Sequence, residues 1–205
     1  MRVGIIGSGH IGATVAGLAA AAGHDVAIAN TRGPERLAGL AAELGVRAET
    51  VAGAAAHGEL VLVAIPVKAY DDLPAADLTG KVVLDAGNYY PERDGRIAEL
   101  DDGTTTSSEL LAARLPRAHV VKAFNTLYWE HLRDRGGPDA DEPRLVVFLA
   151  GDDPAANERA AAFIRELGFV PVATGGLAGG GRRQEIGGPL AGAQVTEQEA
   201  TALLA

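Results

Sequence analysis

The sequence VGIIGSGHIG, residues 3–12, passes from an apolar run directly into a Gly-x-Gly-x-x-Gly pattern. Arg2 to Ile6 is typical of a fully buried strand, and the alanine-rich segment that follows is typical of a helix. In this context the three glycines have different roles. Gly7 permits a tight turn, Gly9 lets the backbone approach a pyrophosphate, and Gly12 lets the helix pack closely on the sheet. The stretch therefore predicts a dinucleotide-binding loop.

The loop between the strand and the helix also supplies backbone donors. The amides of Ser8, Gly9, His10 and Ile11 lie at the predicted helix N-terminus, where unpaired N–H groups and the helix dipole attract an anion. The His10 ring either faces the nicotinamide and phosphates or points to solvent, with only its amide in use. We favour the second interpretation.

The second informative segment begins about 20 residues later, where Asn30-Thr31-Arg32 replaces the acidic residue expected at the end of the second strand. An acid there binds a ribose 2′-hydroxyl, so its absence removes charge repulsion against a 2′-phosphate. The Thr31 hydroxyl and the planar Arg32 guanidinium suit a phosphate. Arg36, one helical turn further, either adds a second positive contact or stays solvated. This segment predicts NADP(H) rather than NAD(H).

The composition narrows the class of protein. The 205 residues suffice for one α/β domain with a modest extension, and 47% apolar residues can form its core. A net charge of −9 without a basic stripe argues against nucleic-acid binding, and the absence of cysteine excludes disulfides and thiolate chemistry. Because we see no leader and no long apolar run, we expect a soluble, cytoplasmic protein without a membrane span.

Strands and helical segments alternate along the whole chain. Strands are expected at residues 2–6, 25–30, 46–51, 59–65, 81–86, 120–124, 145–150 and 169–173. The alternation predicts an α/β protein with a Rossmann-type, doubly wound, mostly parallel sheet in a single domain over residues 1–205. Residues from about 175 to 205 form a small C-terminal extension, which either completes the site or contacts a second subunit.

Ligands of such sheets bind outside the carboxyl ends of the strands. That rule selects three segments: Ile65-Pro66-Val67, Ala86-Gly87-Asn88 and Phe124-Asn125-Thr126. The first segment either lines the nicotinamide side of a cofactor or merely ends a strand. The Asn88 and Asn125 amides either orient a carboxamide or carbonyl group or cap a turn.

No catalytic side chain stands out. None of the five histidines has a carboxylate beside it in a recognisable motif, and no metal-binding motif is present. Lys122 is unusual within a strand, and we expect its ammonium group to reach water. Hydride transfer between two cofactors needs positioning more than proton transfer, so we predict no catalytic residue and no metal.

Six sequence blocks, in order, carry a family resemblance over about residues 2–175. They are residues 3–12, 30–35, 65–66, 88–95, 121–125 and 150–153. The chain resembles the NADPH-dependent reductases of the deazaflavin coenzyme F420. The resemblance implies a homodimer that exchanges hydride between C4 of the nicotinamide and C5 of the deazaflavin.

The resemblance also implies where the two cofactors bind. It implies NADP contacts at Ser8 to Ile11, Thr31, Arg32, Arg36, Ile65 and Val67. It implies a deazaflavin ring stacked across the nicotinamide, near Phe124, Asn125 and Leu177.

Two alternative functions stay open. The first alternative is an NADPH-dependent reductase of another acceptor (a flavin, an imine or a carbonyl). The second is a non-catalytic NADP(H)-binding module. An imine or carbonyl reductase needs a proton donor near the nicotinamide, and none stands out. The tail at Gly175–Gln184 departs from the family pattern. Within it, Arg182 and Arg183 either meet the acidic tail of the deazaflavin or form a solvated turn.

Overall fold

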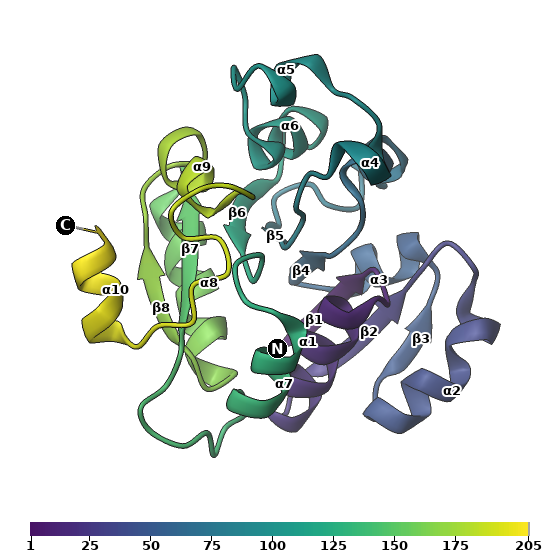
Figure 1. Cartoon of the computed structure of the whole chain (residues 1–205). Coiled ribbons are helices and arrows are strands. Elements are labelled where there is room, and N and C mark those ends of the chain that lie inside the picture. Colours follow the sequence, from purple (N-terminus) through teal and green to yellow (C-terminus); the bar gives the residue numbers. More distant parts are fainter. Residues whose placement is uncertain (205) are drawn as a thin grey trace.

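The computed structural model describes residues 1–204 and contains one eight-stranded sheet in the order β3-β2-β1-β4-β5-β6-β7-β8 (Figure 1). The strands are β1 (Arg2–Ile6), β2 (Asp25–Ala29), β3 (Arg47–Glu49), β4 (Leu60–Val63), β5 (Val82–Asp85), β6 (His119–Ala123), β7 (Val146–Gly151) and β8 (Val170–Ala173). All neighbours are parallel except β6 and β7. The predicted Rossmann-type, mostly parallel α/β sheet is confirmed.

Helices connect the strands. They are α1 (His10–Ala21), α2 (Pro34–Leu44), α3 (Val51–His57), α4 (Pro91–Asp94), α5 (Ala98–Asp101), α6 (Ser107–Arg114), α7 (Trp129–Arg135), α8 (Pro154–Glu166), α9 (Arg182–Gln184) and α10 (Glu197–Leu204). Two further segments are helical but not α-helical. They are the 3₁₀ helix η1 (Val67–Asp72) and the π-helix η2 (Leu177–Gly181). Within residues 1–204, none of the helices has the length and apolar character that crossing a bilayer requires.

Two strands depart from the expected pattern. The third strand is shorter than residues 46–51, because the Thr50 hydroxyl accepts a hydrogen bond from Gly53 N–H at 3.0 Å and starts α3 there. Strand β7 runs antiparallel to β6, with Ala123 opposite Leu149. Strand β7 therefore starts on the side of the sheet where β6 ends. The segment that connects the two strands does not have to return to the opposite side.

The sheet is buried on both faces. Val3 and Ile5 of β1 pack in one apolar cluster with α1, α7 and α8, whereas Ile6 packs in a second cluster with η1 and α6. Because a parallel sheet covered on both faces exposes only its edges and strand ends, ligands reach it at the carboxyl ends of β1, β4, β5 and β6. This position is where the candidate site lies.

Candidate functional site

The loop after β1 has two closely packed glycines and one open glycine. Gly7 has φ +114°, and a Cβ there would lie 2.2 Å from the Ala64 carbonyl oxygen. A Cβ on Gly12 would lie 1.9 Å from the Gly7 carbonyl oxygen, whereas a Cβ on Gly9 would have no heavy atom within 4 Å. The tight turn at Gly7 and the close packing at Gly12 are confirmed. The pyrophosphate contact at Gly9 stays a prediction, and the open space there fits it.

Asn30, which follows β2, connects this loop to the segment expected to bind a 2′-phosphate. Its Nδ2 donates to Ser8 Oγ at 2.7 Å, and its Oδ1 accepts from Arg32 N–H at 2.8 Å. Arg32 and Arg36 are exposed, and neither joins a salt bridge within residues 1–204. From the sequence, only the absence of an acidic residue at Asn30 was predicted to matter. Its hydrogen bond to the Arg32 N–H was missed, although asparagine side chains often accept from the backbone N–H two residues further on.

Two adjoining hollows open at the carboxyl ends of the strands. The first hollow, of about 340 Å³, is lined by Gly9, His10, Ile11, Ala64, Ile65, Pro66, Ala86, Gly87, Asn88, Tyr90 and Arg93. The second hollow, of about 380 Å³, is lined by His10, Ile11, Ala86, Asn88, Tyr90, Phe124, Asn125, Thr126, Leu127, Tyr128, Trp129, Ile186, Ala191 and Gly192. His10, Ile11, Ala86, Asn88 and Tyr90 line both, so the two hollows share one wall.

The residues predicted at the strand ends line these hollows except Val67, and Leu177, which the family resemblance implied at the site, lines neither hollow. Val67 is 2% exposed and Leu177 is 3% exposed, and both pack in the apolar cluster that contains Tyr70. The Leu177 carbonyl accepts a hydrogen bond from Thr106 Oγ1 at 3.3 Å. The structure therefore places neither side chain at the groove where NADP and deazaflavin contacts were expected.

The chain turns sharply where β6 ends. Phe124 has φ +65°, the one positive φ outside glycine in the described part of the chain, residues 1–204, and its ring is buried. Such a conformation costs about 1–3 kcal/mol and must be held by its surroundings. Two amide hydrogen bonds hold it here: Asn88 Nδ2 donates to Asn125 O at 2.9 Å, and Asn125 Nδ2 donates to Asn88 Oδ1 at 3.1 Å.

The same turn leaves one buried acceptor without a partner. Asn125 is 8% exposed, lines the second hollow, and its Oδ1 has no hydrogen-bond partner among the described residues. Buried polar atoms are nearly always hydrogen-bonded in folded proteins. This oxygen is enclosed by protein, so a ligand in the second hollow would reach it only after the Asn125 side chain moves.

Aromatic and apolar side chains surround the mouth of the second hollow. His10 is exposed, and its ring stacks on Trp129, with centroids 4.6 Å apart and planes 15° apart. Tyr90, Tyr128 and Ile186 are exposed by 39%, 63% and 53%. Exposed apolar groups gathered at one hollow mark a binding surface for a flat ring or a partner.

Sequence reasoning missed Trp129, Tyr128 and Ile186 because they come from the start of α7 and from the tail rather than from strand ends. One signal was available: the single tryptophan of the chain follows the Phe124-Asn125-Thr126 segment within a few residues.

The glycine-rich tail forms part of the second hollow through Ile186, Ala191 and Gly192. It is fixed by the Gln184 carbonyl, which accepts from Asn125 Nδ2 at 2.8 Å, and by Glu185 Oε1, which accepts from Ser107 N–H at 2.7 Å. Arg182 and Arg183 line neither hollow, and Arg183 donates to the Leu203 carbonyl at 3.1 Å.

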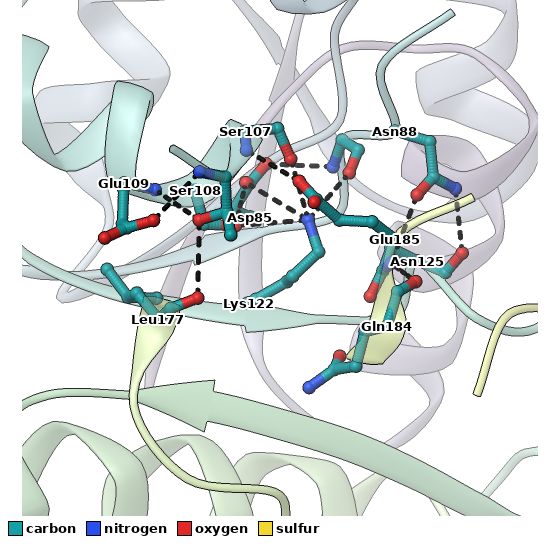
Figure 2. A network of polar contacts seen from close by, with 12 residues as sticks. Asp85, Asn88, Ser107, Ser108, Glu109, Lys122, Asn125, Leu177, Gln184 and Glu185 are labelled. Atoms are coloured by element: carbon teal, nitrogen blue, oxygen red, sulfur yellow. Dashed lines mark hydrogen bonds and ion pairs between the residues drawn. The ribbon is translucent and has the colours of Figure 1, made fainter. Parts of the chain in front are cut away.

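A buried polar network lies behind the hollows (Figure 2). Lys122 on β6 and Asp85 on β5 are register partners, both fully buried, with Nζ and Oδ2 3.9 Å apart. The expectation that Lys122 reaches water is wrong, because the neighbouring strand supplies a carboxylate. The Tyr70 hydroxyl also donates to Asp85 Oδ1 at 2.8 Å. Burial raises the pKa of Tyr70 well above its usual value, so this hydroxyl stays a donor.

The strand order, the glycine loop and the groove define a Rossmann-type nucleotide-binding protein. The family model of coenzyme F420-dependent NADP oxidoreductases matches residues 2–89. A hypothetical protein of Sinorhizobium meliloti is 34% identical and superimposes with a TM-score of 0.85 over 96% of each chain. The chain belongs to the family of coenzyme F420-dependent NADP oxidoreductases, and it is an NADP(H)-dependent oxidoreductase.

Two further solved structures share the fold of this chain. A protein of Arthrobacter, provisionally described as an F420-dependent NADP reductase, is 29% identical, with a TM-score of 0.73 over 86% of each chain. A 3-hydroxyisobutyrate dehydrogenase of Mycobacterium tuberculosis shares the fold, with a TM-score of 0.66 at 17% identity. Here 88% of this chain covers 56% of that one.

Proposed function

We propose that the protein transfers a hydride between NADP(H) and the deazaflavin coenzyme F420. The observation that carries the proposal is the wall shared by the two hollows, formed by His10, Ile11, Ala86, Asn88 and Tyr90. Two flat ligands, one in each hollow, would meet along this wall. Direct transfer between two large cofactors requires such juxtaposition and little else from the protein.

The residues present fit NADP(H). The open space at Gly9 admits a pyrophosphate, and the exposed Arg32 is free to hold a 2′-phosphate while Asn30 holds its backbone. Ile65, Pro66 and Asn88 then border the nicotinamide in the first hollow. Bound NADPH supplies the hydride, and the protein orients the ring and excludes water from its inner side.

The second hollow suits a flat heteroaromatic acceptor. No Asp, Glu, Lys or Arg of residues 1–204 lines it, and its mouth is aromatic. Asn125 lines this hollow and would border the deazaflavin ring. The balanced reaction is NADPH plus F420 plus one proton from solvent, giving NADP⁺ and the reduced deazaflavin. A homodimer stays a prediction from the family.

The deciding experiment mixes the purified protein with NADPH and oxidised F420 and follows the visible absorbance of the deazaflavin. We expect bleaching that depends on the protein, and the reverse reaction with reduced F420 and NADP⁺. A flavin and a cyclic imine serve as competing acceptors. Oxidation of NADPH by one of these, with no bleaching of F420, contradicts F420 as the acceptor but not NADP(H) as the hydride donor.

The variant Trp129→Ala tests whether the acceptor occupies the second hollow. Removing this aromatic wall of the second hollow should raise KM for F420 roughly two- to tenfold, since an aromatic contact contributes about 0.5–1.5 kcal/mol beyond its buried area. Trp129→Phe, which keeps a ring, is the matched control and should stay near wild type. An equal rise in the Kd of NADPH would show instead that Trp129 serves the first hollow.

A further inference from the structure

The Asp85–Lys122 pair is an unusual feature for the interior of a sheet. Lys122 Nζ donates to Ser107 Oγ at 3.0 Å and to Ser108 Oγ at 3.2 Å, and Ser108 Oγ donates to Asp85 Oδ2 at 2.6 Å (Figure 2). Burying two charges is expensive even when they are paired, and apolar residues of similar volume often serve stability as well or better. The pair is thus poorly explained by stability alone.

What the pair holds is the backbone just after β5. Asp85 Oδ1 accepts from Gly87 N–H at 2.8 Å, and Lys122 Nζ donates to the Gly87 carbonyl at 3.2 Å. The N–H and the C=O of one residue are therefore fixed by opposite charges. A side chain at Gly87 is excluded as well, because a Cβ would lie 2.1 Å from the Tyr70 hydroxyl.

This clamped residue borders the site directly. Gly87 and Asn88 line the first hollow together with Gly9 and His10 of the phosphate loop, and Asn88 continues into the second hollow. Asn88 in turn holds the strained turn at Asn125 through the two amide hydrogen bonds. A shift of Gly87 would therefore move Asn88, which belongs to the wall along which the two ligands would meet.

We propose that Asp85 and Lys122 are positioning residues that fix the nicotinamide end of NADP(H) by clamping Gly87. The proposal rests on the proposed placement of the nicotinamide in the first hollow. It does not depend on which acceptor occupies the second hollow. The pair lies behind the wall, and acts on the ligand only through the Gly87 backbone and Asn88.

The test compares binding of NADPH with binding of adenosine 2′,5′-bisphosphate, which lacks the nicotinamide half. In Lys122→Met the Kd of NADPH, measured by calorimetry, should rise roughly tenfold, as for one lost hydrogen-bonding group. The Kd of the bisphosphate should change less than about twofold. The fluorescence of bound NADPH should shift toward that of the free ligand, because its ring is no longer held.

Two further variants keep the test decisive. Lys122→Met alone leaves a buried carboxylate without its partner and can lose stability, so Asp85→Asn/Lys122→Met removes both charges together. Lys81→Met is the matched control: Lys81 Nζ also donates to backbone carbonyls, those of Ala55 and Ala56, but it lines neither hollow. It should lower the melting temperature without changing the ratio of the two Kd values.

The outcomes separate positioning from a structural role. With the acceptor established, kcat per folded site should fall about a hundredfold in the double variant, the effect of a small misplacement of the reacting groups. A parallel loss of both affinities, or unchanged NADPH binding and fluorescence in the folded double variant, overturns the proposal. Absence of F420 reduction in wild type contradicts only the proposed function, because the binding measurements need no acceptor.

Discussion

The variant Gly9→Ala should fold like wild type and bind NADPH more weakly. A Cβ at this position meets no heavy atom within 4 Å, and the residue has φ −73°, which alanine adopts without strain. The open space is the one through which the pyrophosphate would approach the loop amides. Losing one charge-assisted hydrogen bond costs about 1.5–3 kcal/mol, so the Kd of NADPH should rise roughly 10- to 150-fold.

Gly12, the last glycine of the same loop, is the control, because replacing it should lower the stability of the fold. In Gly12→Ala the new Cβ would lie 1.9 Å from the Gly7 carbonyl oxygen, a backbone atom that can move only with the loop. Overpacking of this kind costs about 1–3 kcal/mol, or roughly 2–12 °C in melting temperature for a chain of this size. Calorimetric titration with NADPH and thermal melts of both variants make the comparison.

Two results would contradict the expectation that Gly9 serves ligand binding. If Gly9→Ala binds NADPH like wild type, the ligand does not approach the loop at this point. If Gly9→Ala melts as low as Gly12→Ala, the glycine serves the fold rather than the ligand. Gly39→Ala, on the exposed face of α2 with no atom near the added Cβ, reports the effect of a methyl group alone.

The parts of the fold that follow from local sequence could be predicted. All eight strands were expected near their observed positions, and all except the short β3, Arg47–Glu49, contain apolar runs between turn or helix signals. The strand-end rule also brought Asn88, Phe124 and Asn125 to one groove, since parallel strands end at the same edge. The direction of β7 could not be predicted, because it depends on the path of the chain after α7.

The errors at the site share one physical cause. The partner of Lys122 is Asp85, which stands opposite it only once β5 and β6 are in register. Trp129 matters because it lies against His10, although the two residues are far apart in sequence. Leu177, expected at the site from the family resemblance, packs in the core. Strand register and side-chain packing decide these positions, and a single sequence read by itself reveals neither.

The selection of NADP(H) over NAD(H) should depend on Arg32. Its guanidinium is exposed and joins no salt bridge in the part of the chain that the structure describes, while Asn30 Oδ1 fixes its N–H at 2.8 Å. Arg32→Ala removes the planar donor from the 2′-phosphate. The Kd of NADPH should rise roughly 10- to 150-fold, and the Kd of NADH, which lacks that phosphate, should stay within about twofold.

The matched control is Arg117→Ala, an exposed arginine just before β6, at the opposite end of the strands. It makes the same change in net charge, so a loss of NADPH affinity there would point to the overall field of the protein rather than to a local contact. Salt provides a second check, because exposed charge pairs are screened over about 10 Å at 0.1 M. The preference of wild type for NADPH should shrink as salt rises, and that of Arg32→Ala should barely respond. Equal losses of NADPH and NADH affinity in Arg32→Ala would show that the 2′-phosphate binds elsewhere, with Arg36, one helical turn away, as the next residue to replace.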